Sequence, residues 1–139
     1  MLYGIAHLQV IFREFNKAYF GNILPMPYFR IMHGVNLLGL FTYSPGSVPG
    51  TTEVIDISDF YDYDGNQLRD LLVHEMIHYY LCYTGVEVYP SHGTAFVNMA
   101  RRLNLAYGLN VTPTIDLSKM KPRSDAPFLK RLYFRLISL

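Results

Sequence analysis

The stretch from Asn66 to Tyr83 restricts the fold of this chain more than any other segment. Its spacing predicts one helix that ends at Gly85, and at about 100° per residue its apolar side chains cover most of the helix circumference. These side chains are Leu72, Val73, Met76, Ile77, Tyr80 and Leu81. A helix that is apolar on nearly every side is buried, so the rest of the chain has to surround this one. Its polar exceptions, His74, Glu75 and His78, therefore need an explanation.

The remaining periodic segments predict an α+β domain with no linker inside it. In chain order we expect a helix, three short strands, the long helix, a further helix, and a short terminal helix with a basic face. Their expected ranges are 5–20, 28–33, 38–44, 53–57, 66–83, 93–107 and a part of 128–139. Thr112-Pro113 separates the last two helices.

The spacing of His74 and His78 indicates a metal site on the long helix. Residues four apart lie one above the other on a helix face, so both imidazoles can bind one ion. Glu75 projects about 100° away from His74, close to the site but outside the ligand shell. The pattern H-E-x-x-H on a helix is typical of zinc peptidases, in which the glutamate is the general base for zinc-bound water. The alternative is a pair of core histidines satisfied by hydrogen bonds, but burying these groups without a metal or a partner is costly.

The third ligand has to come from another part of the chain. Where the metzincin extension of this motif needs a glycine and a histidine, the chain has Leu81 and Thr84. No glutamate follows Glu87, which lies in a predicted loop only nine residues after His78. Asp116 and Asp125 stay open as ligands, but both lie beyond the Thr112-Pro113 break. Cys82, four residues after His78 on the same helix face, also stays open, although a free cysteine is usually a small core residue. We favour His92, at the expected start of the next helix, over His7 and His33.

Charge and cysteine content narrow the class of protein. The net charge is only +1, which excludes a uniformly basic nucleic-acid binder, although residues 119–135 carry a local excess of Lys and Arg that could contact DNA. Cys82 is the only cysteine, so neither a disulfide framework nor a thiolate zinc cluster can form. No signal peptide and no apolar run long enough for a membrane helix is evident, and we expect a cytoplasmic protein.

Several motifs together resemble the SprT-like zinc peptidases, a family that includes the Spartan DNA–protein crosslink proteases. They are HEMIH at residues 74–78, HGTAF at 92–96, FNKAYF at 15–20, LPMP at 24–27 and ARRLNLAYGLN at 100–110. The resemblance covers about residues 8–112. It implies a zincin-like catalytic domain, which we place at 1–118, followed by a basic tail at 119–139. The cysteine-built zinc ribbon of many relatives cannot form here, because the chain has one cysteine.

The resemblance implies one catalytic Zn²⁺ held by His74, His78 and His92, with Glu75 as the catalytic residue and a protein or peptide as the substrate. DNA-associated proteins are one expected class of substrate. The alternative function is a non-catalytic, zinc-stabilised domain that recruits protein or DNA. Tyr43, Tyr83 and Tyr89 are candidates for stabilising the oxyanion.

The strand at 53–57 directly precedes the metal helix. Zincin folds commonly have an edge strand at this position, to which an extended substrate adds as a further strand. We therefore expect residues 53–57 at the edge of the sheet.

Overall fold

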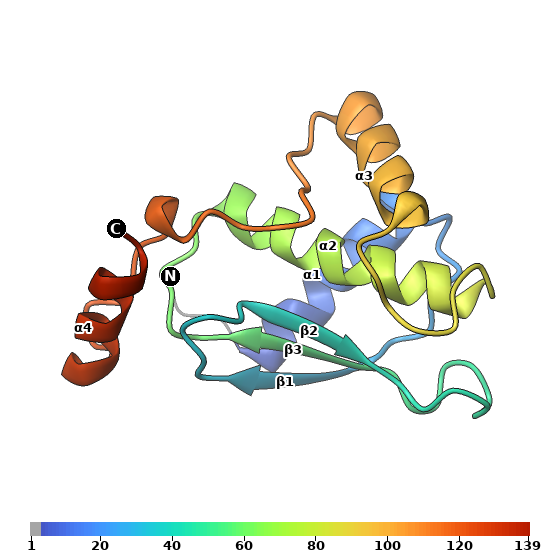
Figure 1. Ribbon diagram of the computed structural model, residues 1–139. Helices are drawn as coiled ribbons and strands as arrows, with labels where there is room; N and C mark the ends of the chain where they lie inside the picture. Colours follow the sequence, from blue (N-terminus) through green and yellow to red (C-terminus); the bar gives the residue numbers. More distant parts are fainter. Residues whose placement is uncertain (1–3) are drawn as a thin grey trace.

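The computed structural model describes residues 4–139, so the first three residues of the predicted 1–118 domain lie outside it. It is a mixed α+β structure with four α-helices and a small three-stranded sheet, as the sequence predicts (Figure 1). The predicted element bounds are correct to within a few residues. The elements are α1 Ile5–Tyr19, β1 Tyr28–Met32, β2 Gly39–Thr42, β3 Val54–Ser58, α2 Gly65–Tyr83, α3 Thr94–Tyr107, the short 3-10 helix η1 Leu117–Lys119 and α4 Phe128–Ile137.

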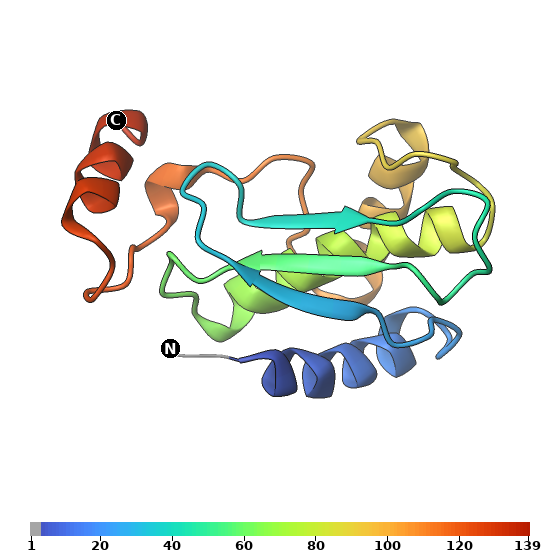
Figure 2. The same ribbon diagram turned by 90° about the horizontal axis from the view of Figure 1, so that it is seen from below.

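The sheet has the strand order β1-β3-β2, so the prediction that residues 53–57 form its edge is wrong. β3 is parallel to β1 and antiparallel to β2, and β2 is the edge strand nearest α2 (Figures 1 and 2). Ile55 and Ile57 are fully buried. Asp56 is tolerated in the central strand because Arg30 of β1 donates to both of its carboxylate oxygens, at 3.0 Å each. The imperfect alternation of this segment is the pattern expected of a covered central strand.

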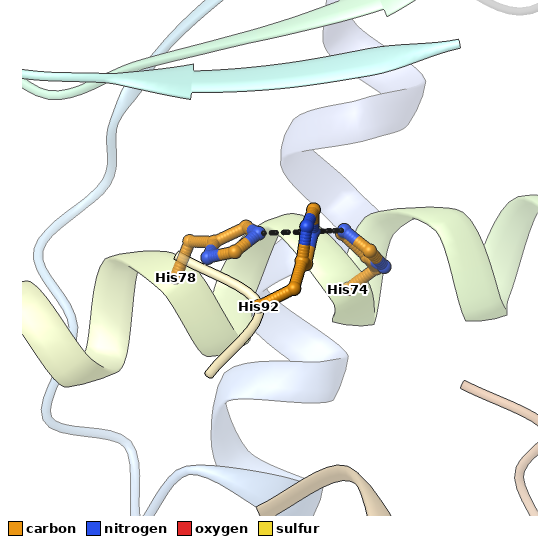
Figure 3. Close-up of side chains that lie close together, drawn as sticks. All are labelled: His74, His78 and His92. Atoms are coloured by element: carbon orange, nitrogen blue, oxygen red, sulfur yellow. Dashed lines mark hydrogen bonds between the residues drawn. The ribbon is translucent and has the colours of Figure 1, made fainter. Parts of the chain in front are cut away.

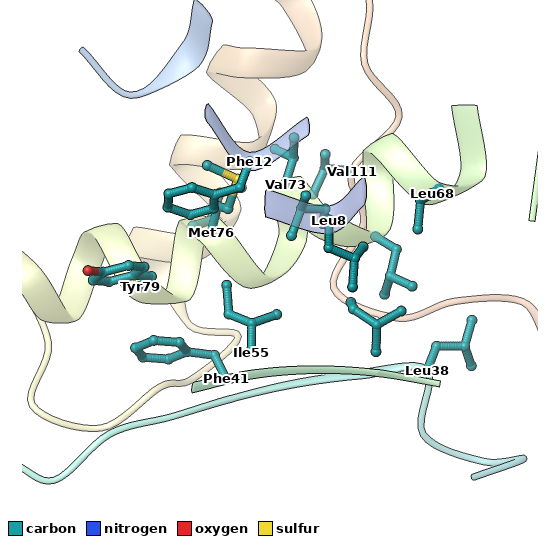
Figure 4. Packing of buried hydrophobic residues seen from close by; sticks show 14 of the residues in the cluster. Leu8, Phe12, Leu38, Phe41, Ile55, Leu68, Val73, Met76, Tyr79 and Val111 are labelled. Carbon is teal, nitrogen blue, oxygen red and sulfur yellow. The ribbon is translucent and has the colours of Figure 1, made fainter. Parts of the chain in front are cut away.

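Helix α2 begins at a capping box and is buried along most of its length. The Asp64 carboxylate accepts a hydrogen bond from the Gln67 backbone N–H at 2.8 Å, and the Gln67 side chain accepts one from the Asp64 N–H at 3.0 Å. The helix packs against the sheet on one side and against α1 and α3 on others (Figures 1 and 4). Val73, Met76 and Ile77 are completely buried, which agrees with its apolar circumference.

A buried asparagine fixes the turn that follows α1. Asn16 donates to the Leu24 carbonyl at 2.8 Å and accepts from the Leu24 N–H at 3.2 Å. Asn22, between them, has a left-handed backbone with φ of 59°, which asparagine tolerates. Tyr79 of α2 then donates to the Pro25 carbonyl at 2.8 Å. The turn therefore holds α1, α2 and the start of β1 in one arrangement.

The chain after α3 returns along α2 to η1 and ends in α4, on the side of the molecule away from α3 (Figure 1). Phe134 attaches α4 by packing against Phe60 and Tyr61, with ring centroids 6.0 and 5.6 Å apart. The exposed surface of α4 is apolar as well as basic, since Phe128 and Leu129 are largely exposed. Within residues 4–139, none of the helices combines the length and apolarity needed to span a bilayer.

Candidate metal centre

Three histidines meet at one point of the structure, and two of them come from α2. His74 and His78 lie one helical turn apart and are buried, whereas His92 lies in the exposed segment just before α3. The His92 Nε2 atom is 3.0 Å from Nε2 of His74 and 3.2 Å from Nε2 of His78 (Figure 3). The structure thus brings together the three residues that the sequence suggested as ligands.

Phe96, on the first turn of α3, packs against all three imidazole rings. Its ring centroid is 4.7 Å from those of His74 and His78 and 5.0 Å from that of His92. Phe96 is completely buried, so it closes the inner side of the cluster. The HGTAF motif therefore supplies both the third histidine and the apolar support behind it.

The geometry of the three nitrogens fits a single metal ion. Tetrahedral zinc with Zn–N bonds of about 2.0–2.1 Å needs ligand nitrogens about 3.3 Å apart, close to the two separations observed. The Nδ1 of His74 donates to the Thr112 carbonyl at 2.8 Å, so its Nε2 presents a lone pair to the centre of the cluster. Burial lowers the pKa of His74 to about 4 and that of His78 to about 3, so both rings are neutral near pH 7. Neutral imidazoles with converging lone pairs can hold a cation.

Glu75 lies beside the histidines but outside their cluster. One of its carboxylate oxygens is 3.9 Å from Nε2 of His74, and the side chain is almost fully buried. Burial raises the pKa of Glu75 to about 8, and a hydrogen bond with the Phe41 backbone opposes this shift. A proton can therefore bind to and leave this carboxyl group near neutral pH.

Gly39 on β2 makes room for the Glu75 carboxylate. A Cβ atom at this position would come within 2.9 Å of the carboxylate and 3.0 Å of Leu71, closer than real Cβ contacts allow. The side chain of any other residue would force Glu75 or the strand to move. The edge strand and α2 are thus fitted to each other at the position of Glu75.

The histidines and Glu75 line a cleft of about 460 Å³. One wall is the edge strand β2, and the other includes Pro113, Ile115 and Leu117 from the segment that returns along α2. Because the cleft is bordered by a strand edge and leads to the histidines, an extended chain could lie in it with one of its bonds beside the cluster.

The other residues considered from the sequence lie outside the histidine cluster. Asp116 caps η1 by accepting from the Ser118 N–H, Asp125 pairs with Arg123, and Glu87 accepts from Ser91. Cys82 points toward the Val88 carbonyl, with Sγ at 4.0 Å. His33 contacts Asp59 at the end of β1, and His7 is exposed on α1.

None of the three tyrosines suggested for the oxyanion lines this cleft. Tyr43 donates to the Val88 carbonyl instead, and Tyr89 is largely exposed.

Three supporting residues were not identified from the sequence. Thr112 acts through its carbonyl and Phe41 through its backbone, and neither contribution depends on side-chain type. Gly39 leaves only a weak signal, a glycine within a predicted strand, which often marks a close approach of another group.

Comparison with known proteins identifies the family. The model of the SprT-like family matches residues 8–115. No curated protein and no solved structure matches the chain. The matched range contains the sheet, α2, α3, Glu75 and all three histidines. The chain therefore belongs to the SprT-like family.

Proposed function

We propose that this protein is a zinc-dependent metallopeptidase with a zincin-like fold. The observation that carries the proposal is the convergence of the three Nε2 atoms, with the Glu75 carboxylate 3.9 Å from one of them and an edge strand alongside. Zinc is the metal most consistent with a compact set of imidazole nitrogens in tetrahedral spacing. Three protein ligands leave one position for water or substrate, as in catalytic rather than structural zinc sites.

Glu75 is the proposed general base. When bound, zinc would acidify a water molecule and polarise the scissile carbonyl. Glu75 takes the proton from the attacking water and returns one to the leaving amine. Burial raises its pKa in the metal-free protein, and a zinc ion held beside it would lower that pKa again and favour the carboxylate that accepts a proton. The hydrogen bond with the Phe41 backbone and the space at Gly39 hold its carboxylate in position.

The edge strand β2 is the proposed binding surface for the substrate backbone. Leu38 and the residues at alternate positions after it direct their backbone groups toward β3, as the hydrogen bond from the Ser58 N–H to the Leu38 carbonyl indicates. By the same alternation Gly39 and Phe41 direct theirs away from β3, where the Phe41 backbone forms a hydrogen bond with Glu75, and both residues line the cleft. A peptide that adds to this edge would run directly past the histidines.

DNA-associated proteins remain a proposed class of substrate, with DNA contacted through residues 119–135. Not all of the basic charge in this segment is available to DNA. Arg123 is paired with Asp125 at 2.7 Å, and Lys130 donates to the His33 carbonyl at 2.9 Å. Replacing the exposed Lys119, Lys121 and Arg135 by glutamine, which leaves Met120 and Phe134 in the core, should lower DNA affinity at low salt if these charges contact phosphates.

A paired measurement tests the peptidase proposal. Bound zinc and cleavage of an unfolded protein substrate are determined for the native chain and for Glu75→Gln, each with and without DNA. We expect both forms to hold one zinc per chain, and cleavage to fall by at least roughly 10³-fold in the variant because its general base is lost. If both forms hold zinc and neither cleaves under any condition, the non-catalytic zinc-stabilised domain is the better description. If neither holds zinc, both functions are wrong.

A further inference from the structure

A second cavity, of about 270 Å³, opens beside the cleft at its His74 end. The N-terminal half of α2 forms one side of it, and the segment from Asn110 to Met120 forms the other. The cavity shares Leu38, Leu71, His74, Thr114 and Ile115 with the cleft. A group bound next to the metal centre can therefore enter this cavity without leaving the cleft. We call this cavity the side pocket.

The fixed part of the side pocket is apolar. Leu38, Leu71 and Met120 are core residues that are buried apart from the surface they present to the pocket. Tyr63 is also buried, and its hydroxyl donates to the Ser58 carbonyl at 2.9 Å. These walls are held by the packing of the domain itself, so the pocket does not depend on an occupant for its shape.

The acidic groups around the side pocket already have partners, and the one cation among its described lining residues, Lys119, is exposed to solvent at the rim. Asp70 accepts from the Arg69 side chain at 3.0 Å and from the Asn110 N–H at 3.3 Å. Gln67 is engaged in the capping box of α2, and the Asp116 carboxylate caps η1. An anionic occupant could pair only with the solvent-exposed Lys119, and such exposed pairs contribute little, whereas an apolar occupant would gain from leaving water.

We propose that the side pocket receives a large apolar side chain of the substrate, from a residue next to the scissile bond. This inference rests on the proposed zinc site, because the position of the occupant is defined by the histidines. Apolar side chains of the size of leucine, methionine or phenylalanine are the expected occupants, and they are favoured over acidic ones.

Binding of hydroxamates to the zinc-loaded protein tests the proposal without requiring turnover. The compounds bind metal through the same group and differ in one adjacent substituent, which is hydrogen, isobutyl or carboxymethyl. We expect the isobutyl compound to bind roughly 10- to 100-fold more tightly than the hydrogen compound, the gain typical of burying a leucine-sized side chain. The carboxymethyl compound should bind no more tightly than the hydrogen compound.

Two variants of Met120 locate the effect in the side pocket. Met120→Phe fills it and should remove most of the isobutyl preference, and Met120→Ala enlarges it and should shift the preference toward a benzyl substituent. Leu117→Ala is the matched control, because Leu117 lines the cleft but not the side pocket. Zinc content is measured for every variant. Equal affinity for the hydrogen and isobutyl compounds, or a preference unchanged in both Met120 variants, would overturn the proposal.

The outcomes separate this inference from the proposed function. Cleavage of peptides without an apolar preference, together with equal hydroxamate affinities, would leave a peptidase whose side pocket is not used. An isobutyl preference that depends on Met120, in a protein that cleaves nothing, would support the side pocket and contradict the peptidase. Failure to bind zinc at all would remove the basis of both.

Discussion

The two parts of the candidate metal centre are held in the protein in very different ways. His74, Glu75 and His78 belong to a buried helix whose neighbours are core side chains. His92 belongs to the exposed segment from Thr84 to Gly93, which we call the ligand loop. Apart from the ring contacts of His92 and the hydrogen bonds at the end of α2, this loop is attached to the domain mainly by two hydrogen bonds. The Glu87 N–H donates to the Leu81 carbonyl at 3.0 Å, and Tyr43 donates to the Val88 carbonyl.

This difference indicates how the site is assembled. Folding of the domain places the α2 residues, because their positions follow from burial of the helix. The ligand loop gains much less from burial, so the metal itself should contribute strongly to its order. The predictions below test whether folding alone places the α2 residues while the metal orders the ligand loop, and they start with the largest expected effect.

Removing the metal should expose the ligand loop to proteolysis and leave α2 intact. Cleavage within residues 84–93 should be roughly 100-fold slower when free zinc is about 100 times its dissociation constant, since binding then suppresses opening by that factor. Limited proteolysis with mass spectrometry, with zinc and with a chelator, gives the sites and rates. If the chelated protein were cleaved within α2 before the ligand loop, the loop would not be the part that depends on the metal.

The pH dependence of stability should originate in α2. Below pH 6.5 the unfolded metal-free chain takes up protons at His74 and His78, which stay neutral in the folded protein down to about pH 4 and 3. Between pH 4.5 and 8 the unfolded chain has lost a proton that folded Glu75 keeps. Below pH 6.5 the two protons gained by the unfolded histidines outnumber the one kept by folded Glu75, so stability falls as the pH falls. Above pH 6.5 mainly Glu75 differs between the two states, so stability falls as the pH rises. The contribution of these residues to stability is therefore greatest near pH 6.5.

Urea denaturation of the metal-free protein measures this effect. One unbalanced proton corresponds to about 1.4 kcal/mol per pH unit, and the groups are only partly titrated at the ends of each range. The free energy of unfolding should therefore fall by about 1 kcal/mol from pH 6.5 to 8, and by about 2 kcal/mol from pH 6.5 to 4.5. In Glu75→Gln the decline above pH 6.5 should disappear, and in His92→Ala both declines should persist. A Glu75→Gln protein with an unchanged alkaline decline would show that Glu75 is not the source.

Replacing the histidines should separate folding from metal binding. In the metal-free protein, His74→Ala should lower the free energy of unfolding by about 1–2 kcal/mol, because it leaves the Thr112 carbonyl without its donor and a gap against Phe96. His92→Ala should change it by less than about 0.5 kcal/mol, as expected for an exposed site. Both variants should lose zinc. Equal destabilisation by the two substitutions would show that the ligand loop is as firmly packed as α2.

The smallest expected effect concerns the attachment of the ligand loop. Tyr43→Phe removes the hydrogen bond to the Val88 carbonyl, and we expect zinc affinity to fall by about 2- to 10-fold, the range for one such bond. Competition with a chromogenic chelator measures the affinity. Tyr89→Phe serves as the control, because Tyr89 is exposed on the same loop. Similar losses in both variants would argue against a specific role of Tyr43.

The sequence predicts the histidine cluster well because the positions of its members follow from helical spacing and from the packing of two consecutive helices. His74 and His78 are one helical turn apart, and His92 lies just before a helix that packs against theirs. The strand order was not predictable in the same way. Residues 53–57 precede α2 directly, but whether they pair on one side or on both depends on where β1 lies.

Backbone contributions were also hidden from the sequence. The Thr112 carbonyl reaches His74 across 38 positions of the chain, and any residue at 112 could provide it. The apolar surface of α4 was missed for a different reason. Helical spacing shows that Phe128, Leu129 and Phe134 do not all share a face, but not which of them meets the domain.

The strand order β1-β3-β2 also has a consequence for the folding pathway. β2 and β3 are joined by residues 43–53 and pair antiparallel between positions 12 to 18 apart, a shorter range than the pairing of β1 and therefore a smaller loss of chain entropy. β1 can join the sheet only along the other side of β3, through a parallel pairing of residues that are 26 positions apart. Pairings of this longer range form more slowly. The strand that borders the cleft of the histidines should therefore form early, and β1, on the far side of β3, should complete the sheet late.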